Sequence, residues 1–260
     1  MDNLLLNLVF VILALLILLN LARLWKVEAD WGKYSTLLLV LALLALLALI
    51  GVRIAAAGRL PFANMYEFTL LFCAGILAAS LVARRGLESS RLDLTVGLLT
   101  LLIVSIGSSL PSELRPLMPA LQSVWLSAHV ATAVIAYGCF ALAFCLGILS
   151  LTKSTDPGVS LAEIDGRIYR LAVFGFTFLT IVIISGAVWA EEVWGNWWTW
   201  DPKETWSLVT WLVYAAYLHA RRSYGWKGRK SAWMVVLGFI IVMFTLFGVS
   251  ILLPGLHSYV

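Results

Sequence analysis

The chain alternates between long apolar stretches and short polar connections. A helix needs about 20 consecutive apolar residues to cross the hydrocarbon core of a bilayer. That length predicts about eight membrane-spanning helices, at 4–21, 34–52, 65–83, 94–110, 121–151, 171–189, 202–220 and 232–253. We therefore expect an all-α polytopic membrane protein in which residues 1–260 form a single transmembrane domain.

Two of these spans need a separate argument. The stretch 121–151 has 31 residues without a charge, and such a helix is about 46 Å long, so it must tilt or project from the bilayer. The span 202–220 is long enough because Asp201, Pro202 and Glu204 form a helix start, with an N-cap carboxylate, a proline at the first position and a glutamate at N3. Without that span, the C-terminus would lie on the opposite side.

The composition agrees with this class. Of the 260 residues, 62% are hydrophobic and 12% are charged, which excludes a soluble globular protein and gives no indication of a nucleic-acid partner. No basic region precedes the first apolar run and no cleavage site lies near Asn20, so we expect a retained helix there. Cys73, Cys139 and Cys145 form no CxxC or CxxCH motif, which argues against a thiol–disulfide relay and against covalent haem on this chain.

Lysine and arginine positions predict the orientation. The alternate connections 22–33, 84–93, 152–170 and 221–231 hold fourteen of the eighteen basic residues. Because basic residues concentrate in cytoplasmic loops, these four connections are expected inside. Both termini, and the loop at about 190–204, are then expected on the outer, periplasmic or lumenal, side.

Residues 194–206, here called the tryptophan segment, read WGNWWTWDPKETW and hold five of the twelve tryptophans. Gly195 and Asn196 break regular structure before Asp201 caps the next helix. The flat indole faces in between favour a wall for a large planar apolar ligand. The alternative is an aromatic belt at the membrane interface, although belts scatter their aromatic residues.

The three histidines fall at informative positions. His129 lies near the outer end of the fifth span, one turn after Trp125, and His257 follows the last span, so both are expected on the face of the tryptophan segment. Neutral imidazoles are good iron ligands, and such a pair could hold a planar macrocycle axially. Alternatively, His129 donates an interhelical hydrogen bond and His257 is solvated and idle.

His219 is expected near the inner end of the seventh span, beside Arg221 and Arg222. A histidine at membrane depth is a candidate functional residue, and the arginines could pair with the propionates of a second haem. No other histidine of this chain lies at that depth, so a second ligand would come from another polypeptide. The alternative is an interfacial side chain that extends toward lipid phosphates.

Polar residues also follow the second span. Pro61 and Asn64 predict a turn and a helix start, and Glu67 lies within the next apolar run. A glutamate there either complements the helix dipole or pairs with a base such as Arg53. Arg53 could instead hold an anionic group of a ligand, which makes Arg53, Asn64 and Glu67 possible residues of a haem path.

Together these residues resemble a known family. WGNWWTWDPKE resembles the WWD signature of the haem-handling proteins of cytochrome c biogenesis, and its ending is closest to the CcsA/ResC kind. His129 and His257 resemble the two outer haem ligands of that family, and His219 resembles its intramembrane histidine. The string from Pro61 to Glu67 resembles its P-x-x-N-x-x-E region.

The resemblance implies a subunit of a membrane cytochrome c haem lyase or synthase complex, with non-covalent haem b as ligand. The outer haem would lie between His129 and His257, and the residues assigned around it are Trp194, Gly195, Trp197, Trp198, Trp200 and Asp201. The complex would present haem to the CxxCH thiols of apocytochrome c, and no residue here need act as acid or base. The resemblance also implies a CcsB/ResB-type partner, which supplies the second ligand beside His219, and a bacterial cytoplasmic membrane or a thylakoid membrane.

Three alternatives stay open. A haem-delivery protein of the CcmC kind has a WWD loop between two histidines but usually six spans and no lysine–glutamate ending. An electron-transfer haem b subunit expects paired histidines within the bilayer at matched depths. A haem-free transporter would use Glu67 and Arg53 for coupling.

Overall fold

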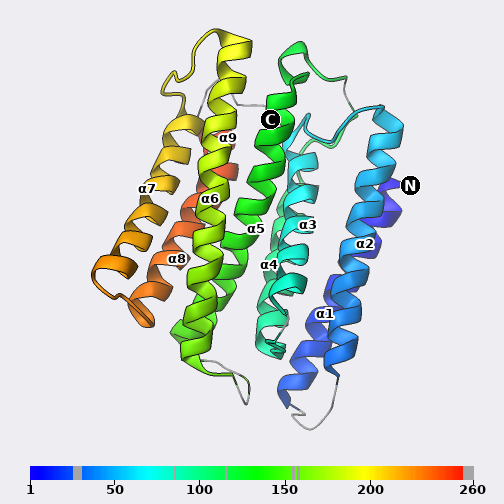
Figure 1. Cartoon of the computed structure of the whole chain (residues 1–260). Coiled ribbons are helices and arrows are strands. Elements are labelled where there is room, and N and C mark those ends of the chain that lie inside the picture. Colours follow the sequence, from blue (N-terminus) through cyan, green and yellow to red (C-terminus); the bar gives the residue numbers. More distant parts are fainter. Residues whose placement is uncertain (26–30, 85, 115, 154–155, 157–158, 254–260) are drawn as a thin grey trace.

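The computed structural model describes residues 1–25, 31–84, 86–114, 116–153, 156 and 159–253. This part of the chain is all helical and contains no strand, as the apolar pattern predicts. The long helices run alternately up and down in one bundle, and their connections lie at its two ends (Figure 1). The elements are α1 (Asp2–Trp25), α2 (Gly32–Ala57), α3 (Met65–Ala83), α4 (Ser90–Ser108), η1 (Pro119–Leu121), α5 (Val124–Thr152), α6 (Leu161–Trp194), α7 (Pro202–Ser223), α8 (Arg229–Met243), η2 (Phe244–Gly248) and α9 (Val249–Leu252).

Within the described residues, seven helices are long and apolar enough to cross a membrane: α1 to α6 and the continuous segment Arg229–Leu252. The predicted eighth helix is present as α7, with 22 residues and the predicted start at Pro202. It lies alongside α6 and α8 (Figure 1), but its composition alone does not qualify it as a span, because charged residues occupy its first and last turns. The protein is therefore an integral membrane protein with seven candidate spans among the described residues and an eighth, more polar helix in the same bundle.

The starts of α3 and α7 agree with the sequence prediction and the other starts differ by two to ten residues, of which α6 and α5 are the two most informative cases. Helix α6 begins at Leu161, ten residues earlier than expected, because Ser160 caps it and its first turns are charged. At 34 residues it is about 51 Å long. Helix α5 begins three residues later than expected, because η1 forms a separate 3-10 turn and the Ser123 side chain caps α5 by accepting from the Trp125 N–H.

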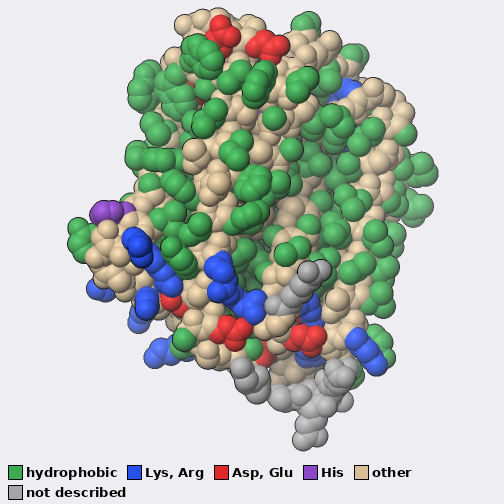
Figure 2. Space-filling view, in the orientation of Figure 1, with side chains coloured by type: hydrophobic (Ala, Val, Ile, Leu, Met, Phe, Trp, Pro, Cys, Tyr) green, Lys and Arg blue, Asp and Glu red, His purple; other side chains and the backbone are tan. Residues whose placement is uncertain are grey.

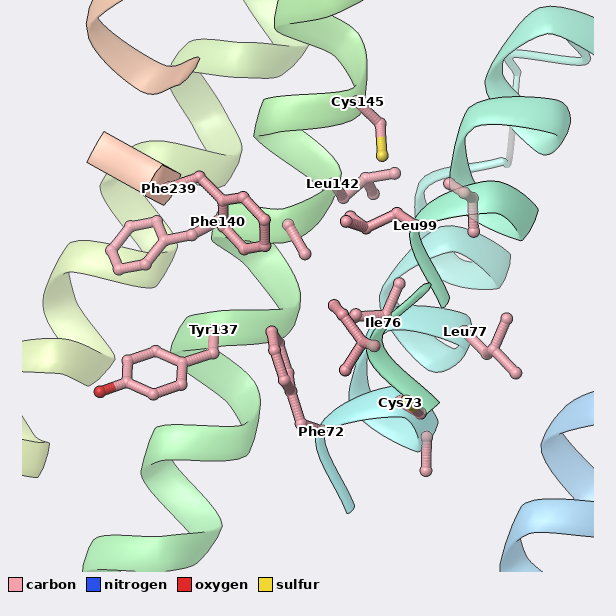
Figure 3. Packing of buried hydrophobic residues seen from close by; sticks show 14 of the residues in the cluster. Phe72, Cys73, Ile76, Leu77, Leu99, Tyr137, Phe140, Leu142, Cys145 and Phe239 are labelled. Atoms are coloured by element: carbon pink, nitrogen blue, oxygen red, sulfur yellow. The ribbon is translucent and has the colours of Figure 1, made fainter. Parts of the chain in front are cut away.

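Glycines bring α3 and α5 into backbone contact. A Cβ atom placed on Gly138 would lie 2.8 Å from the carbonyl oxygen of Gly75, and one on Gly75 would lie 2.9 Å from that of Val134. Aromatic side chains fill the core beside this contact, where Phe72 of α3 and Tyr137 of α5 pack edge to face with ring centroids 6.0 Å apart (Figure 3). Small residues allow the same close approach in membrane helix pairs generally.

Charged groups lie at the two ends of the bundle. Most of the visible Lys and Arg side chains gather at the end where α6 begins and α7 ends, here called the basic end (Figure 2). The tryptophan segment lies at the opposite end, here called the tryptophan end, together with the start of α1 (Figure 1). The predicted separation of basic connections from the tryptophan segment is confirmed, whereas the membrane side of each end stays a prediction.

The Gly75–Gly138 contact predicts a steric effect on stability. We expect Gly138→Ala to lower the free energy of unfolding by about 1–3 kcal/mol, because the added methyl group overpacks two backbones. Gly51→Ala is the matched control, since a Cβ atom there meets nothing within 4 Å and alanine favours the helix. Unfolding by sodium dodecyl sulfate in mixed micelles measures both, and equal midpoints for the two variants would contradict the packing argument.

Candidate ligand-binding site

A cavity of about 180 Å³ lies at the tryptophan end of the bundle, with α3, α5, α6, α7 and η2 as its walls. Most of its lining is apolar or aromatic, and it includes Phe62, Met65, Phe68, Trp189, Trp197 and Trp198. Sites that enclose a drug-sized ligand usually measure roughly 300–1,000 Å³. A larger planar ligand must therefore displace part of the wall or enter by one edge.

His129 of α5 lines this cavity and contacts α6. Its Nδ1 atom lies 2.8 Å from the carbonyl oxygen of Val182. Since a carbonyl oxygen only accepts hydrogen bonds, Nδ1 carries the proton, and the lone pair of the neutral ring lies on Nε2. Metal-binding histidines are commonly oriented in this way, by donation from the other ring nitrogen to a backbone carbonyl.

Gly186 gives the His129 ring its place against α6. A Cβ atom at Gly186 would lie 2.8 Å from His129 Nδ1 and 2.9 Å from its Cε1, so any other residue would displace the ring. Trp189 follows on the same face of α6, with its ring centroid 6.5 Å from that of His129, and its Nε1–H donates to the carbonyl oxygen of Ala120 at 2.8 Å. The imidazole is thus positioned by the α6 backbone and bordered by a fixed indole.

The tryptophan segment contributes to the cavity unequally. Trp197 and Trp198 line it, as predicted for a wall. Trp194 packs edge to face on Trp189, with centroids 4.9 Å apart, and Trp200 packs in the same way on Trp198 at 5.7 Å. Trp194 and Trp200 therefore support the lining residues and are not part of the lining.

Two lining groups of the tryptophan segment have an unused hydrogen-bonding atom, the Trp198 indole and the Glu204 carboxylate, whose Oε1 atom has no partner among the described residues. The Nε1 atom of Trp198 is buried and has no hydrogen-bond partner among the described residues. Burying an indole N–H without an acceptor costs free energy. A ligand with an acceptor atom would recover this cost.

Two residues with positive φ angles, Gly195 and Trp200, shape the bends of the tryptophan segment. Gly195 ends α6 with a φ of 71°, and its N–H donates to the carbonyl oxygen of Glu191 at 2.8 Å. Trp200 has a φ of 60°, a left-handed conformation that few residues other than glycine adopt. Neither residue lines the cavity, so their part is to shape the loop.

The predicted capping box at the start of α7 is confirmed. The Asp201 side chain accepts from the Lys203 N–H at 2.9 Å. The Oε2 atom of Glu204 accepts from the N–H groups of Thr199 and Asp201, at 2.8 and 3.2 Å, and from the Thr199 hydroxyl at 3.2 Å. These bonds hold the strained end of the segment, including the Trp200 backbone between the two donors.

The polar residues between α2 and α3 form a buried ion cluster. Arg53 and Arg59 contact the two Glu67 oxygens, with N–O distances of 3.3 and 2.9 Å. Arg53 also pairs with Asp2 at 2.8 Å, and Asn64 caps α3 by accepting from the Glu67 N–H. The predicted pairing of Glu67 with Arg53 is confirmed, and of the three possible path residues Asn64 alone is among those that line the cavity.

The residues near the basic end separate onto two faces of α7. His219 is exposed, with its Nδ1 atom 3.5 Å from the Ser223 hydroxyl and its ring against Tyr224. Arg221 points instead into the α6–α7–α8 contact, where it holds Asp165 at 2.7 and 2.8 Å. Residues two apart on a helix do not face each other, so the expected grouping is corrected: Arg222, which is exposed, shares the His219 side, and Arg221 does not.

The second predicted outer ligand, His257, lies outside the described residues. Its pairing with His129 stays a prediction.

Several lining residues are absent from the sequence prediction. Gly186 and Trp189 are not among the predicted site residues, and Trp189 is only the end of a predicted span. A signal is nevertheless present in the period of α6, because Val182, Gly186 and Trp189 recur on one helical face. The sequence identifies Lys203 as part of a helix start, and its side chain also lines the cavity.

The fold and the site define a polytopic helical membrane protein with an aromatic, histidine-containing cavity at one end. Residues 3–257 match the family model described as "Cytochrome C assembly protein". The chain belongs to this family of cytochrome c biogenesis proteins, and the predicted CcsA kind is confirmed by its relatives.

Those relatives are similar over most of their length. The chain is 37% identical over 251 residues to "Cytochrome c biogenesis protein CcsA" of Guillardia theta, which covers 85% of this chain and 83% of that protein. It is 36% identical over 286 residues to the protein of the same name from Synechococcus sp. strain RCC307, covering 95% and 92%. For the protein from Chlamydomonas reinhardtii, the identity is 41% over 242 residues, with 86% and 66% covered.

Among solved structures, the chain is similar to "Cytochrome c Heme Lyase CcmF", with a TM-score of 0.72 and 19% identity. The match covers 95% of this chain and 46% of that one, so this chain spans about half the length of that protein. At this identity the likeness shows a shared fold alone.

The capping box predicts a local effect on the tryptophan segment. We expect Glu204→Ala to release the Thr199 and Asp201 N–H groups and to destabilise the start of α7 by about 0.5–2 kcal/mol. Chymotrypsin, which cleaves after exposed aromatic residues, should then cut the segment faster. Glu191→Ala, at an exposed position near the end of α6, is the control, and the same cutting rate in both variants would contradict the role of Glu204.

Proposed function

We propose that this chain is the haem-handling subunit of a membrane cytochrome c synthase complex. It would bind haem b without a covalent bond in the cavity at the tryptophan end. From there it would present haem to the CxxCH cysteines of apocytochrome c for thioether formation. The observation that carries the proposal is the orientation of His129, whose Nδ1 is engaged by the Val182 carbonyl in a cavity lined with aromatic side chains.

His129 and His257 are proposed as the axial ligands of the outer haem iron. The hydrogen bond to Val182 supports this part for His129, since it leaves the lone pair on the nitrogen remote from α6. For His257 the support is the family resemblance and its place directly after the last helix. Imidazole ligands on both faces would fix the iron and set its potential.

The donor set of the cavity suits a flat apolar molecule with a few polar groups. Trp197 and Trp198 offer broad faces, and Trp198 also offers an unused N–H. The cavity volume of about 180 Å³ is small, so the tryptophan segment must move outward when haem enters. Trp197 and Trp200, which are exposed, would then lie on the side that apocytochrome c approaches, and Trp194, Gly195 and Asp201 would keep the segment folded.

The part of this chain in the reaction is positional. Haem, as the substrate, supplies the vinyl groups that the cysteine thiols attack, and no side chain here is proposed as a general acid or base. Holding both reactants in one orientation and excluding water accounts for large rate gains without such groups.

A second, inner haem site is proposed at His219. Its support is that His219 is exposed on the surface of α7, where another polypeptide can reach it. Arg222 is proposed to pair there with a propionate, whereas Arg221 is already held by Asp165. The second iron ligand would come from a CcsB/ResB-type membrane partner.

The same proposal assigns the membrane sides. Because Lys and Arg side chains gather at the basic end, that end is proposed to be cytoplasmic or stromal. The tryptophan segment is then periplasmic or lumenal, in a bacterial cytoplasmic membrane or a thylakoid membrane, and the Arg53–Glu67 cluster lies on the same side.

Histidine substitutions test the function. We expect His129→Ala and His257→Ala, each expressed with a CcsB-type partner, to lose most of the Soret absorbance of one haem. Imidazole added to the medium should restore it by replacing the missing ligand. His219→Ala should affect a different haem, and wild-type spectra for all three variants would refute the ligand assignments.

Gly186→Ala tests the positioning of His129 separately. The added methyl group would occupy the place of the ring, so we expect weaker haem binding in the outer site, by roughly tenfold or more, without loss of the ligand itself. Gly51→Ala is again the matched control. Haem titration followed by Soret absorbance makes the measurement, and a wild-type affinity of Gly186→Ala would show that the α6 contact does not orient the ligand.

A further inference from the structure

Lys203 is a half-buried cation in the wall of the cavity. It lies in the first turn of α7, and its Nζ atom is 4.0 Å from the thioether sulfur of Met65. A thioether is a weak acceptor. Among the residues that the structure describes, no Asp or Glu oxygen lies within 4.0 Å of this ammonium group.

The acidic residues in the same turn are engaged elsewhere. Asp201 accepts from the backbone N–H of Lys203, and Glu204 accepts from the backbone of Thr199 and of Asp201. Asp201 and the Oε2 atom of Glu204 therefore serve the capping box, whereas the Oε1 atom of Glu204 is buried without a hydrogen-bond partner among the described residues. The Lys203 ammonium keeps the thioether contact without a directly bound counter-charge.

Three other cations inside the bundle have carboxylate partners. Arg53 pairs with Asp2 and Glu67, Arg84 with Asp93, and Arg221 with Asp165. A buried charge without a counter-charge is destabilising. Of these four cations, Lys203 alone has no carboxylate within 4.0 Å among the described residues, and it is located at the cavity.

We infer that Lys203 binds a carboxylate of the ligand that enters this cavity. The inference rests on the proposed function, in which that ligand is haem and the carboxylate is a propionate. The lining of the cavity is mostly apolar, and it includes the Glu204 carboxylate on the α7 side. The Lys203 ammonium on the α3–α7 side would select the edge of the macrocycle that faces Met65 and Lys203. Lys203 is thus a positioning residue that sets the rotation of the haem about the axis through the iron and its axial ligands.

The alternative is a packing role for the Lys203 side chain. In that case its methylene groups cover Met65 and help to dock α7 on α3. Removing the charge would then leave ligand selectivity unchanged. The two roles make different predictions for ligands that differ only in their carboxylates.

The experiment compares haem with haem dimethyl ester, in which both carboxylates are esterified and uncharged. The full chain, purified with its membrane partner, is titrated with each ligand and followed by Soret absorbance. We expect the parent to bind haem roughly 10- to 100-fold more tightly than the ester, as for hydrogen bonds to charged groups. Lys203→Met should lose this preference because it weakens the binding of haem and leaves the binding of the ester unchanged. Lys203→Arg should keep most of the preference.

Stability gives a second readout. Lys203→Met keeps the length of the side chain and removes a half-buried cation that has no carboxylate within 4.0 Å among the described residues. Without ligand it should therefore unfold at a higher detergent fraction than the parent, whereas a packing role alone predicts an unchanged midpoint. Lys227→Met is the matched control, because Lys227 is exposed in the connection between α7 and α8. It should change neither ligand preference nor stability.

The outcomes separate the two proposals. Equal affinities of the parent for haem and its ester would overturn the role of Lys203 and leave the haem function standing. The role of Lys203 is also overturned if Lys203→Met weakens the binding of haem and the binding of the ester by the same factor. It is overturned as well if Lys203→Arg loses the preference for haem. If the parent binds neither ligand, the proposed function fails and the inference fails with it.

Discussion

The constraint that governs this structure is the cost of an unsatisfied polar group in an apolar bundle. In a bilayer no water is available to such groups, so the protein must satisfy them itself. The chain does this at both ends, with the Arg53–Glu67 cluster near the start of α3 and the Arg221–Asp165 pair at the start of α6. The Trp198 N–H, the Glu204 Oε1 atom and the Lys203 ammonium at the cavity are less well satisfied, as is the Tyr214 hydroxyl in the core.

The same constraint explains how one histidine becomes a ligand candidate. An imidazole inside the bundle needs an acceptor, and the helix backbone offers one only where a glycine lets the ring come close. Gly186 supplies that space and the Val182 carbonyl supplies the acceptor. Satisfying one ring nitrogen in this way fixes the chemistry of the other.

Much of the architecture can be predicted from the sequence, for physical reasons. Length and hydropathy locate the helices, and α3 has the predicted bounds Met65–Ala83. The capping box at Asp201 is local chemistry that three residues are enough to indicate. The extended start of α6 escapes prediction because its first turns are charged, and charge hides a helix from a hydropathy argument. Likewise, the space at Gly186, the Arg221–Asp165 pair and the place of Lys203 in the cavity wall depend on which helix faces meet, and no single-helix pattern contains that information.

The last helix departs from regular geometry where it borders the cavity. Phe244–Gly248 forms a π turn, and Thr245 and Leu246 from this turn line the site. Its wider turn is held by side-chain bonds, such as that between the Thr210 and Thr245 hydroxyls. On the other side of the cavity, the backbones of α3 and α5 are in direct contact and leave no space between the two helices. The two sides therefore differ in compliance. Under the proposed function, the tryptophan segment and the α7–η2 side would yield to a rigid disc, while the α3–α5 side would act as a stiff support.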